Sequence, residues 1–186
     1  PKVDQVDKPE MLYTAVHHAR EPGGLSILIY YMWYLLENYN TDPAIQYLIN
    51  NTELYFIPLV NPDGYLHDQT ISPNGGGFWR KNRRLNVDGT RGVDLNRNYD
   101  YEFGYDNNGS SPNPSSEVYR GTHGFSEPET QAVKLFCEQH QFQFALNYHT
   151  YSNLLIYPWG YIPSLLTPDS DLFIETAKHM TEFNHY

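Results

Sequence analysis

Short runs with strand character recur along the chain, each bounded by turn-forming residues. They are rich in aromatic, β-branched and other apolar residues, and the run before His149 alternates between apolar and polar positions. These features are typical of strands that are buried on at least one face. The predicted strands are Met11–Val16, Glu53–Val60, Phe142–His149 and Leu154–Tyr157.

Apolar residues recur at helical spacing between the first two predicted strands. The mostly apolar stretch Leu25–Tyr39 predicts a helix that is buried. The shorter stretch Ala44–Asn50 predicts a second helix before the next strand. Strands that alternate with helices in this way predict an α/β domain, in which helices cover both faces of a central sheet.

Two further helices are indicated by their start signals. Ser126 is followed three residues later by Glu129, which is the pattern of a capping box. It predicts a helix that ends near His140. The segment Thr167–Asp169 predicts the start of a last helix, which we expect to run to near Tyr186.

A long segment with little periodicity separates the second and third predicted strands. It follows the turn signal Asn61–Gly64 and extends from Tyr65 to Gly124. It contains three consecutive glycines and a low-complexity piece, Asp106–Ser116. Irregular segments of this length inside a domain are usually functional or disordered.

The composition narrows the possible functions. Hydrophobic residues make up 40% of the 186 residues, which excludes general disorder. The net charge of −10 argues against nucleic-acid binding, because phosphate contacts need a basic surface. The richest apolar run, Leu25–Leu36, is too short to span a membrane. Cys137 is the only cysteine and is interpreted as a buried structural thiol.

Half of the basic residues lie in one short segment, although the chain as a whole is acidic. This concentration predicts a local site for an anion. The six residues are Arg80, Lys81, Arg83, Arg84, Arg91 and Arg97.

Three residues have the side chains and positions expected of a zinc site. His18 and Glu21 lie three residues apart after a predicted strand, and His149 ends a later one. In α/β sheets the ends of the strands face the ligand crevice. Zinc hydrolases use three His or Glu ligands and leave a fourth position open. Taken alone, His-x-x-Glu is more often a capping or surface pair, and His149 could be an ordinary histidine at a sheet edge.

Several arginines strengthen the case for a catalytic site. Arg20 lies between the first two candidate ligands, Arg80 follows two aromatic residues, and Asn96-Arg97 follows Asp94. A guanidinium group binds a carboxylate through two hydrogen bonds and also stabilises an oxyanion. The alternative reading is a solvated basic loop, and it is the interpretation adopted for Arg83, Arg84 and Arg91.

Five motifs, which are given in chain order at the end of this paragraph, closely resemble those of the zinc carboxypeptidases of the carboxypeptidase A/B type. The resemblance extends from the first predicted strand to about Gly160. It implies a mixed, mostly parallel central sheet with helices on both faces, of which residues 1–186 form a partial catalytic domain, incomplete at both ends. The motifs are His17–Glu21, Asn61–Tyr65, Phe78–Arg83, Gly92–Asn98 and His149–Ser152.

The resemblance also implies a role for each matching residue. His18, Glu21 and His149 match the zinc ligands, and Zn²⁺ is the implied cofactor. Asp94 matches the acidic residue that orients the first histidine ligand, and Arg80 matches the arginine that polarises the scissile carbonyl and holds the oxyanion.

The remaining matches concern the substrate. Asn96 and Arg97 match the pair that binds the free C-terminal carboxylate of a peptide. Arg20 matches a residue that contacts the peptide further from the cleaved bond. Tyr151 matches a tyrosine in the wall of a subsite. The implied partners are therefore the C-termini of peptides or proteins, with no nucleic acid and no membrane.

The resemblance implies an enzyme, a metallocarboxypeptidase that hydrolyses the C-terminal peptide bond through a zinc-activated water. The family's general-base glutamate lies beyond the matched region, and neither Glu175 nor Glu182 is assigned to that role. We therefore expect the 186 residues to bind zinc with little or no hydrolysis. The alternatives are an inactive carboxypeptidase-like peptide-binding module, and a zinc amide hydrolase acting on acyl-amino acids or cell-wall peptides. The family resemblance further implies an extracellular or periplasmic location, while the oligomeric state stays open.

Overall fold

The computed structural model describes residues 8–184. These residues fall into two compact units, one ending at Thr150 and one beginning at Tyr151. Within residues 8–184, no helix combines the length and the apolar character needed to cross a bilayer.

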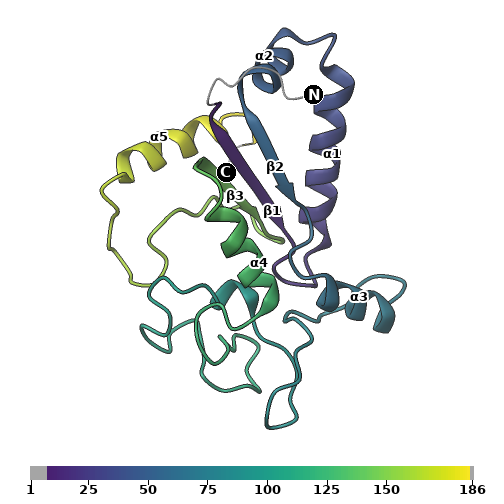
Figure 1. Ribbon diagram of the computed structural model, residues 1–186, viewed down its shortest axis with the longest axis vertical. Coiled ribbons are helices and arrows are strands. Elements are labelled where there is room, and N and C mark those ends of the chain that lie inside the picture. The colour runs from purple at the N-terminus through teal and green to yellow at the C-terminus, as the bar shows by residue number, and fades with distance from the viewer. Residues whose placement is uncertain (1–7, 185–186) are drawn as a thin grey trace. The chain divides into compact units, whose positions relative to one another are not determined.

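A parallel sheet of three strands forms the centre of the first unit (Figure 1). The middle strand β1 (Glu10–Ala15) pairs on one side with β2 (Glu53–Ile57) and on the other with β3 (Phe142–Tyr148). In the register of β1 and β3, Ala15 is paired with Tyr148. The two strands therefore end side by side, and the residues that follow them emerge at the same edge of the sheet.

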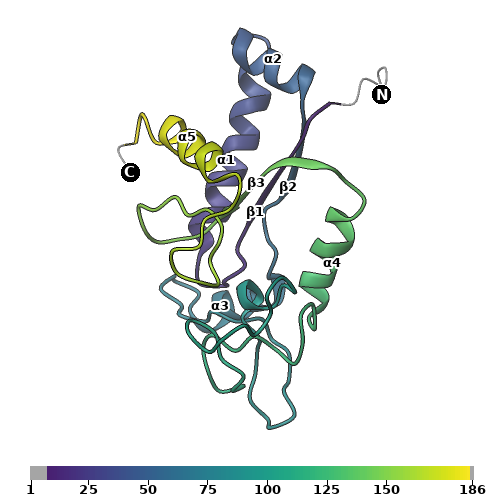
Figure 2. The ribbon, with the colours of Figure 1, turned by 90° about the vertical axis from the view of Figure 1, so that its left-hand side faces the viewer.

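Helices cover the two faces of this sheet, as the sequence predicts. Figure 2 shows α1 (Pro22–Asn38) and α4 (Pro128–Cys137) on opposite sides of the strands. On the α1 side, Leu28 packs with Tyr13 of β1 in one core cluster. On the other side, Val133 of α4 packs in a second cluster.

The helix predicted over Leu25–Tyr39 is confirmed as α1, but the prediction that it is buried is wrong. Only Gly24, Leu28 and Leu35 of the helix are buried. Trp33 is 62% exposed and Leu36 is 72% exposed. One face of α1 packs on the sheet, and the apolar residues of its other face lie on the surface of the described unit.

The second helix and second strand are found with shifted ends. The helix α2 (Pro43–Asn51) is capped by the preceding Asp42, whose side chain accepts hydrogen bonds from two backbone N–H groups. Strand β2 stops at Ile57, before Pro58, and is only half-buried, whereas the sequence predicted a buried strand to Val60. Proline has no N–H for a strand ladder, which explains the early end.

The turn predicted at Asn61–Gly64 is instead the start of a helix, α3 (Pro62–Ile71). The Asn61 side chain accepts a hydrogen bond from the backbone N–H of Gly64, and Pro62 occupies the first turn. Residues 65–71 of the segment predicted to be irregular are therefore helical. The rest of that segment is mostly irregular apart from the short 3-10 helix η1 (Leu95–Arg97).

The capping box predicted at Ser126 and Glu129 is wrong. The residue before α4 is Glu127, and its side chain makes no capping hydrogen bond. Ser126 Oγ instead donates to Glu127 Oε1, and the Glu129 carboxylate accepts from Asn82. The helix ends at Cys137 rather than near His140, and Cys137 is half-buried rather than buried.

The second unit contains one helix, α5 (Ser170–Met180), among its described residues. The predicted last helix is thus confirmed but ends before Tyr186, which lies outside the described residues. Residues 154–157 form no strand, contrary to the prediction. Glu175 of α5 is exposed, as expected for a residue on a solvated helix face, and Glu182 is exposed just beyond the end of the helix.

Candidate active site

The backbone changes direction sharply where β1 ends, and this turn places the two histidines that follow. Val16 is fully buried and adopts a φ of 56°, which is rare for a β-branched residue. Its carbonyl accepts a hydrogen bond from Asn61 N, and the Asn61 side chain donates to the His17 carbonyl. A conformation of this kind costs about 1–3 kcal/mol and persists only where surrounding contacts hold it.

The start of α1 approaches the strand ends closely. A Cβ atom at Gly24 would lie 3.2 Å from both the Ala15 side chain and the Tyr148 carbonyl oxygen. Glycine at this position lets the helix approach the ends of β1 and β3. Glu21, which directly precedes the helix, is thereby held beside residues that follow both strands.

The three predicted metal ligands meet at this edge of the sheet. His18 Nδ1 lies 2.7 Å from Glu21 Oε1, and His149 Nδ1 lies 2.8 Å from Glu21 Oε2. The two Nδ1 atoms are 3.2 Å apart. One ligand atom from each residue lies within 4.8 Å of the others. His18 and Glu21 are buried, while the His149 side chain is 32% exposed.

This donor set fits a catalytic zinc ion. It supplies two imidazole nitrogens and one carboxylate, which are ligands that zinc hydrolases use. The exposed side of His149 gives access from solvent, as a fourth coordination position would require. The three residues come from two strand ends and one helix start, so folding of the sheet brings them together.

Charge interactions within the site favour the ionised carboxylate. Burial alone would raise the pKa of Glu21, but hydrogen bonds from His149 and His18 lower it to about 2. Burial would likewise lower the pKa of His18, but the adjacent carboxylates of Asp94 and Glu21 raise it above its usual value. Glu21 is therefore negatively charged at neutral pH before any metal binds.

Asp94 connects His18 to Arg80. It is fully buried, and its Oδ2 accepts hydrogen bonds from Arg80 Nε at 2.9 Å and from Nη2 at 2.8 Å. Its Oδ1 lies 3.3 Å from His18 Nε2, a contact of ion-pair length whose geometry falls short of a hydrogen bond. The Arg80 side chain is 12% exposed, and within the described part of the chain its Nη1 donates to no residue.

Asn96 and Arg97 form part of the 3-10 helix η1, directly after Asp94. The Asp94 side chain caps η1 by accepting from Asn96 N at 3.0 Å. The Asn96 side chain is exposed. Arg97 is half-buried and donates from Nε to the Gly109 carbonyl at 2.7 Å and from Nη1 to the Asn96 carbonyl at 3.1 Å. The pair is thus adjacent to the residue that contacts Arg80 and His18.

The two remaining predicted residues are on the surface. Arg20 is exposed, donates to the Phe78 carbonyl at 3.3 Å and lies 3.9 Å from Glu117. Tyr151 is the first residue of the second unit and is 95% exposed. The roles assigned to them by resemblance stay predictions.

His17 is a neighbour of the site that the sequence analysis did not single out. It is buried, its Nε2 lies 2.7 Å from Tyr99 Oη, and its ring stacks on His149 at 5.7 Å. Burial, together with the nearby His149 and His18, lowers the pKa of His17 to about 3. It is therefore neutral at neutral pH and packs behind the exposed ligand. The His17-His18 doublet was the only sequence signal for it.

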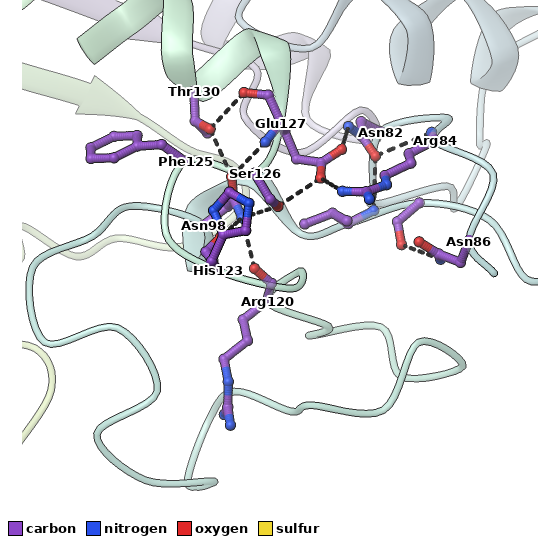
Figure 3. A network of polar contacts seen from close by, with 12 residues as sticks. Asn82, Arg84, Asn86, Asn98, Arg120, His123, Phe125, Ser126, Glu127 and Thr130 are labelled. Carbon is purple, nitrogen blue, oxygen red and sulfur yellow. Dashed lines mark hydrogen bonds and ion pairs between the residues drawn. The ribbon is translucent and has the colours of Figure 1, made fainter. Parts of the chain in front are cut away.

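A buried polar network around Glu127 was also missed (Figure 3). The fully buried Glu127 carboxylate accepts hydrogen bonds from Asn82 at 2.8 Å, Arg84 at 2.5 Å and Ser126 at 2.8 Å. The prediction that Arg84 belongs to a solvated loop is therefore wrong, because a buried carboxylate needs a paired cation. Asn82 also accepts from Val93 N, which fixes the segment leading to Asp94.

Comparisons with known proteins identify a family and relatives that this chain resembles. A family profile described as zinc carboxypeptidase matches residues 1–186. Carboxypeptidase A4 of Mus musculus is 34% identical over 178 residues, which cover 94% of this chain and 40% of that protein. Carboxypeptidase A2 of Rattus norvegicus is 36% identical over 157 residues, covering 83% of this chain and 36% of that protein.

Two solved structures also superpose on this chain. The crystal structure of carboxypeptidase A from Helicoverpa armigera superposes with a TM-score of 0.82 at 28% identity, covering 94% of this chain and 41% of that one. Thrombin activatable fibrinolysis inhibitor superposes with a TM-score of 0.85 at 28% identity, covering 99% and 46%. The chain thus spans less than half the length of each of these four proteins.

Proposed function

This chain belongs to the zinc carboxypeptidase family, and on that premise we propose that it holds the metal and the substrate C-terminus of a zinc-dependent exopeptidase. The observation that carries the proposal is the meeting of His18, Glu21 and His149, with Arg80 and Asp94 directly behind them. The proposed reaction is hydrolysis of the C-terminal peptide bond of peptides and proteins.

His18, Glu21 and His149 would hold the ion. When bound, Zn²⁺ supplies Lewis acidity, which lowers the pKa of a water molecule and polarises a carbonyl. The protein contributes a preformed anionic ligand, because Glu21 has a pKa of about 2. Asp94 lies against the far nitrogen of His18, and a carboxylate in that position fixes the ring orientation and raises ligand basicity.

Arg80 is proposed to stabilise the negative charge that develops on the carbonyl oxygen of the cleaved bond. Asp94 holds the guanidinium through Nε and Nη2, so that Nη1 is left for a ligand. A donor that is already oriented stabilises developing charge without reorganisation during the reaction. The same carboxylate therefore contacts both Arg80 and the ligand His18.

Asn96 and Arg97 are proposed to bind the free carboxylate of the substrate. Binding of the terminal carboxylate would determine which peptide bond lies at the metal. It would therefore restrict cleavage to the bond before the last residue. Arg20 and Tyr151 are proposed to contact the peptide further along. An extracellular or periplasmic location stays a prediction of the family resemblance.

The test compares a short peptide that has a free C-terminal carboxylate with its C-terminal amide, using the zinc-loaded protein and calorimetric binding. We expect the wild-type chain to prefer the acid. Arg97→Ala should weaken binding of the acid roughly tenfold or more, as for loss of a hydrogen bond to a charged group, and leave the amide nearly unchanged. Equal losses for both peptides would contradict the role of Arg97, and equal wild-type affinities would favour a hydrolase for other amides.

A further inference from the structure

The guanidinium group of Arg120 holds one short loop of the irregular segment. Its Nη1 donates to the Asp106 carbonyl at 3.1 Å, to Asn107 Oδ1 at 3.0 Å and to Ser110 Oγ at 3.0 Å. These acceptors lie on both sides of Gly109 along the chain. The Arg120 side chain therefore links residues on both sides of Gly109 and, together with hydrogen bonds within the loop, holds the conformation of residues 106–110.

The same loop contacts the residue proposed to bind the substrate carboxylate. The Gly109 carbonyl accepts a hydrogen bond from Arg97 Nε at 2.7 Å. Gly109 has a φ of +76°, which glycine adopts readily and other residues rarely do. The direction of this carbonyl thus depends on the conformation that Arg120 helps to fix.

The backbone of Arg120 is anchored to the other side of η1. Asn98, directly after Arg97, is fully buried and donates from Nδ2 to the Arg120 carbonyl at 2.8 Å. Figure 3 shows this bond, with the Arg120 side chain pointing away from Asn98. Asn98 is itself fixed, because its Oδ1 accepts from Thr130 Oγ1 at 2.7 Å. The contacts form a closed ring from η1 through Arg120 and the loop back to Arg97.

This ring determines which part of the Arg97 guanidinium is available. Nε is occupied by Gly109, and Nη1 donates to the Asn96 carbonyl. In residues 8–184, Nη2 of Arg97 donates to no acceptor. A carboxylate needs donors held in a fixed orientation to bind with directional hydrogen bonds.

We propose that Arg120 is a positioning residue: through the loop 106–110 it orients Arg97 so that Nη2 meets the C-terminal carboxylate of a peptide. The inference rests on the proposed function of Arg97. It adds a residue to the selection of a free carboxylate over an amide, although Arg120 itself touches no substrate.

A spectroscopic experiment tests the positioning without any substrate. In ¹H–¹⁵N spectra of the zinc-loaded protein, the Arg97 Nε–H signal is assigned by its loss in Arg97→Lys. We expect this signal to be protected from exchange in the wild type, and to lose protection in Arg120→Gln and in Gly109→Ala. Protection that persists in both variants overturns the inference.

Matched controls separate positioning from general damage. Gly89 has a φ of +83° and, like Gly109, has no atom within 4 Å of the place a Cβ would take. Gly89→Ala therefore introduces the same backbone strain away from Arg97. Arg91→Gln removes an exposed arginine from the same irregular segment. Both controls should keep the Arg97 signal protected.

The peptide pair provides the functional readout. We expect Arg120→Gln and Gly109→Ala to reduce the preference for acid over amide roughly tenfold, the effect of weakening one hydrogen bond to a charged group. A preference that stays at the wild-type value in both variants overturns the inference. A wild-type protein that binds acid and amide equally overturns the proposed function, whereas the exchange experiment still decides whether Arg120 orients Arg97.

Discussion

His18 and His149 follow two parallel strands that end side by side, and their Nδ1 atoms lie 3.2 Å apart. The sequence separates them by 131 residues. Only the strand register and the close approach of α1 bring them together with Glu21. The metal site is thus a direct product of the order of strands in the sheet.

Glu21→Gln should weaken zinc binding by more than roughly a hundredfold, since losses of 10–100-fold are typical even for residues outside the ligand set. Glutamine keeps the size of the side chain and removes the charge that faces both histidines. Competition with a chromophoric chelator measures the affinity. Glu175→Gln, an exposed change in the second unit, serves as the control and should bind zinc like the wild type. Similar affinities for all three proteins would refute the ligand role.

Asp94→Asn should weaken zinc binding by roughly 10–100-fold, the range for residues that orient a metal ligand. Asparagine keeps an acceptor near Arg80 but loses the negative charge beside His18. The same chelator competition measures the effect. An affinity equal to that of the wild type would show that Asp94 does not support His18.

The stability of the metal-free protein should fall at acid pH because of Glu21. Its pKa falls from 4.5 to about 2 on folding, through hydrogen bonds that outweigh burial. The stabilisation is therefore present above about pH 4.5 and lost as the pH falls toward 2. The pKa of His18 is raised from 6.5, so its stabilisation is present below that value and lost as the pH rises through the folded pKa. Urea unfolding measured between about pH 4.5 and 2 should show that the free energy of unfolding declines less steeply in Glu21→Gln than in the wild type. Parallel declines in the two proteins would contradict the contribution of Glu21 to stability.

Because only one face of α1 is buried, we expect two leucines of this helix to contribute differently to the free energy of unfolding. Leu28 is fully buried against the sheet, whereas Leu36 is 72% exposed. Leu28→Ala should lower the free energy of unfolding by about 2–5 kcal/mol. Leu36→Ala should change it by about 0.5 kcal/mol or less. Urea unfolding decides between this result and equal losses, which would mean that both faces are buried in solution.

The sequence predicted the elements of the fold better than their ends and surroundings. The strands containing Tyr13 and Leu146 were found because apolar periodicity reflects burial directly. Asn61–Gly64 was interpreted as a turn because asparagine and proline favour turns and helix starts alike. Periodicity also gave no means to tell that Trp33 and Leu36 lie on the exposed side of α1.

The candidate site, like the fold, could be predicted only in part from the sequence. The proximity of His18 and Glu21 could be predicted from the sequence, because both belong to one turn of the chain. Their meeting with His149 was expected from strand ends and is found. The pairing of Arg84 with the buried Glu127 could not be predicted, because the two residues lie 43 positions apart and no periodic pattern links them.

X-ray absorption at the zinc edge of the zinc-loaded protein tests the proposed metal site most directly. We predict one zinc per chain, with only nitrogen and oxygen neighbours at about 2.0–2.2 Å and scattering from two imidazole rings. In His149→Ala the contribution of one imidazole should disappear. A sulfur neighbour from Cys137, or an imidazole count unchanged in His149→Ala, would contradict zinc binding by His18, Glu21 and His149.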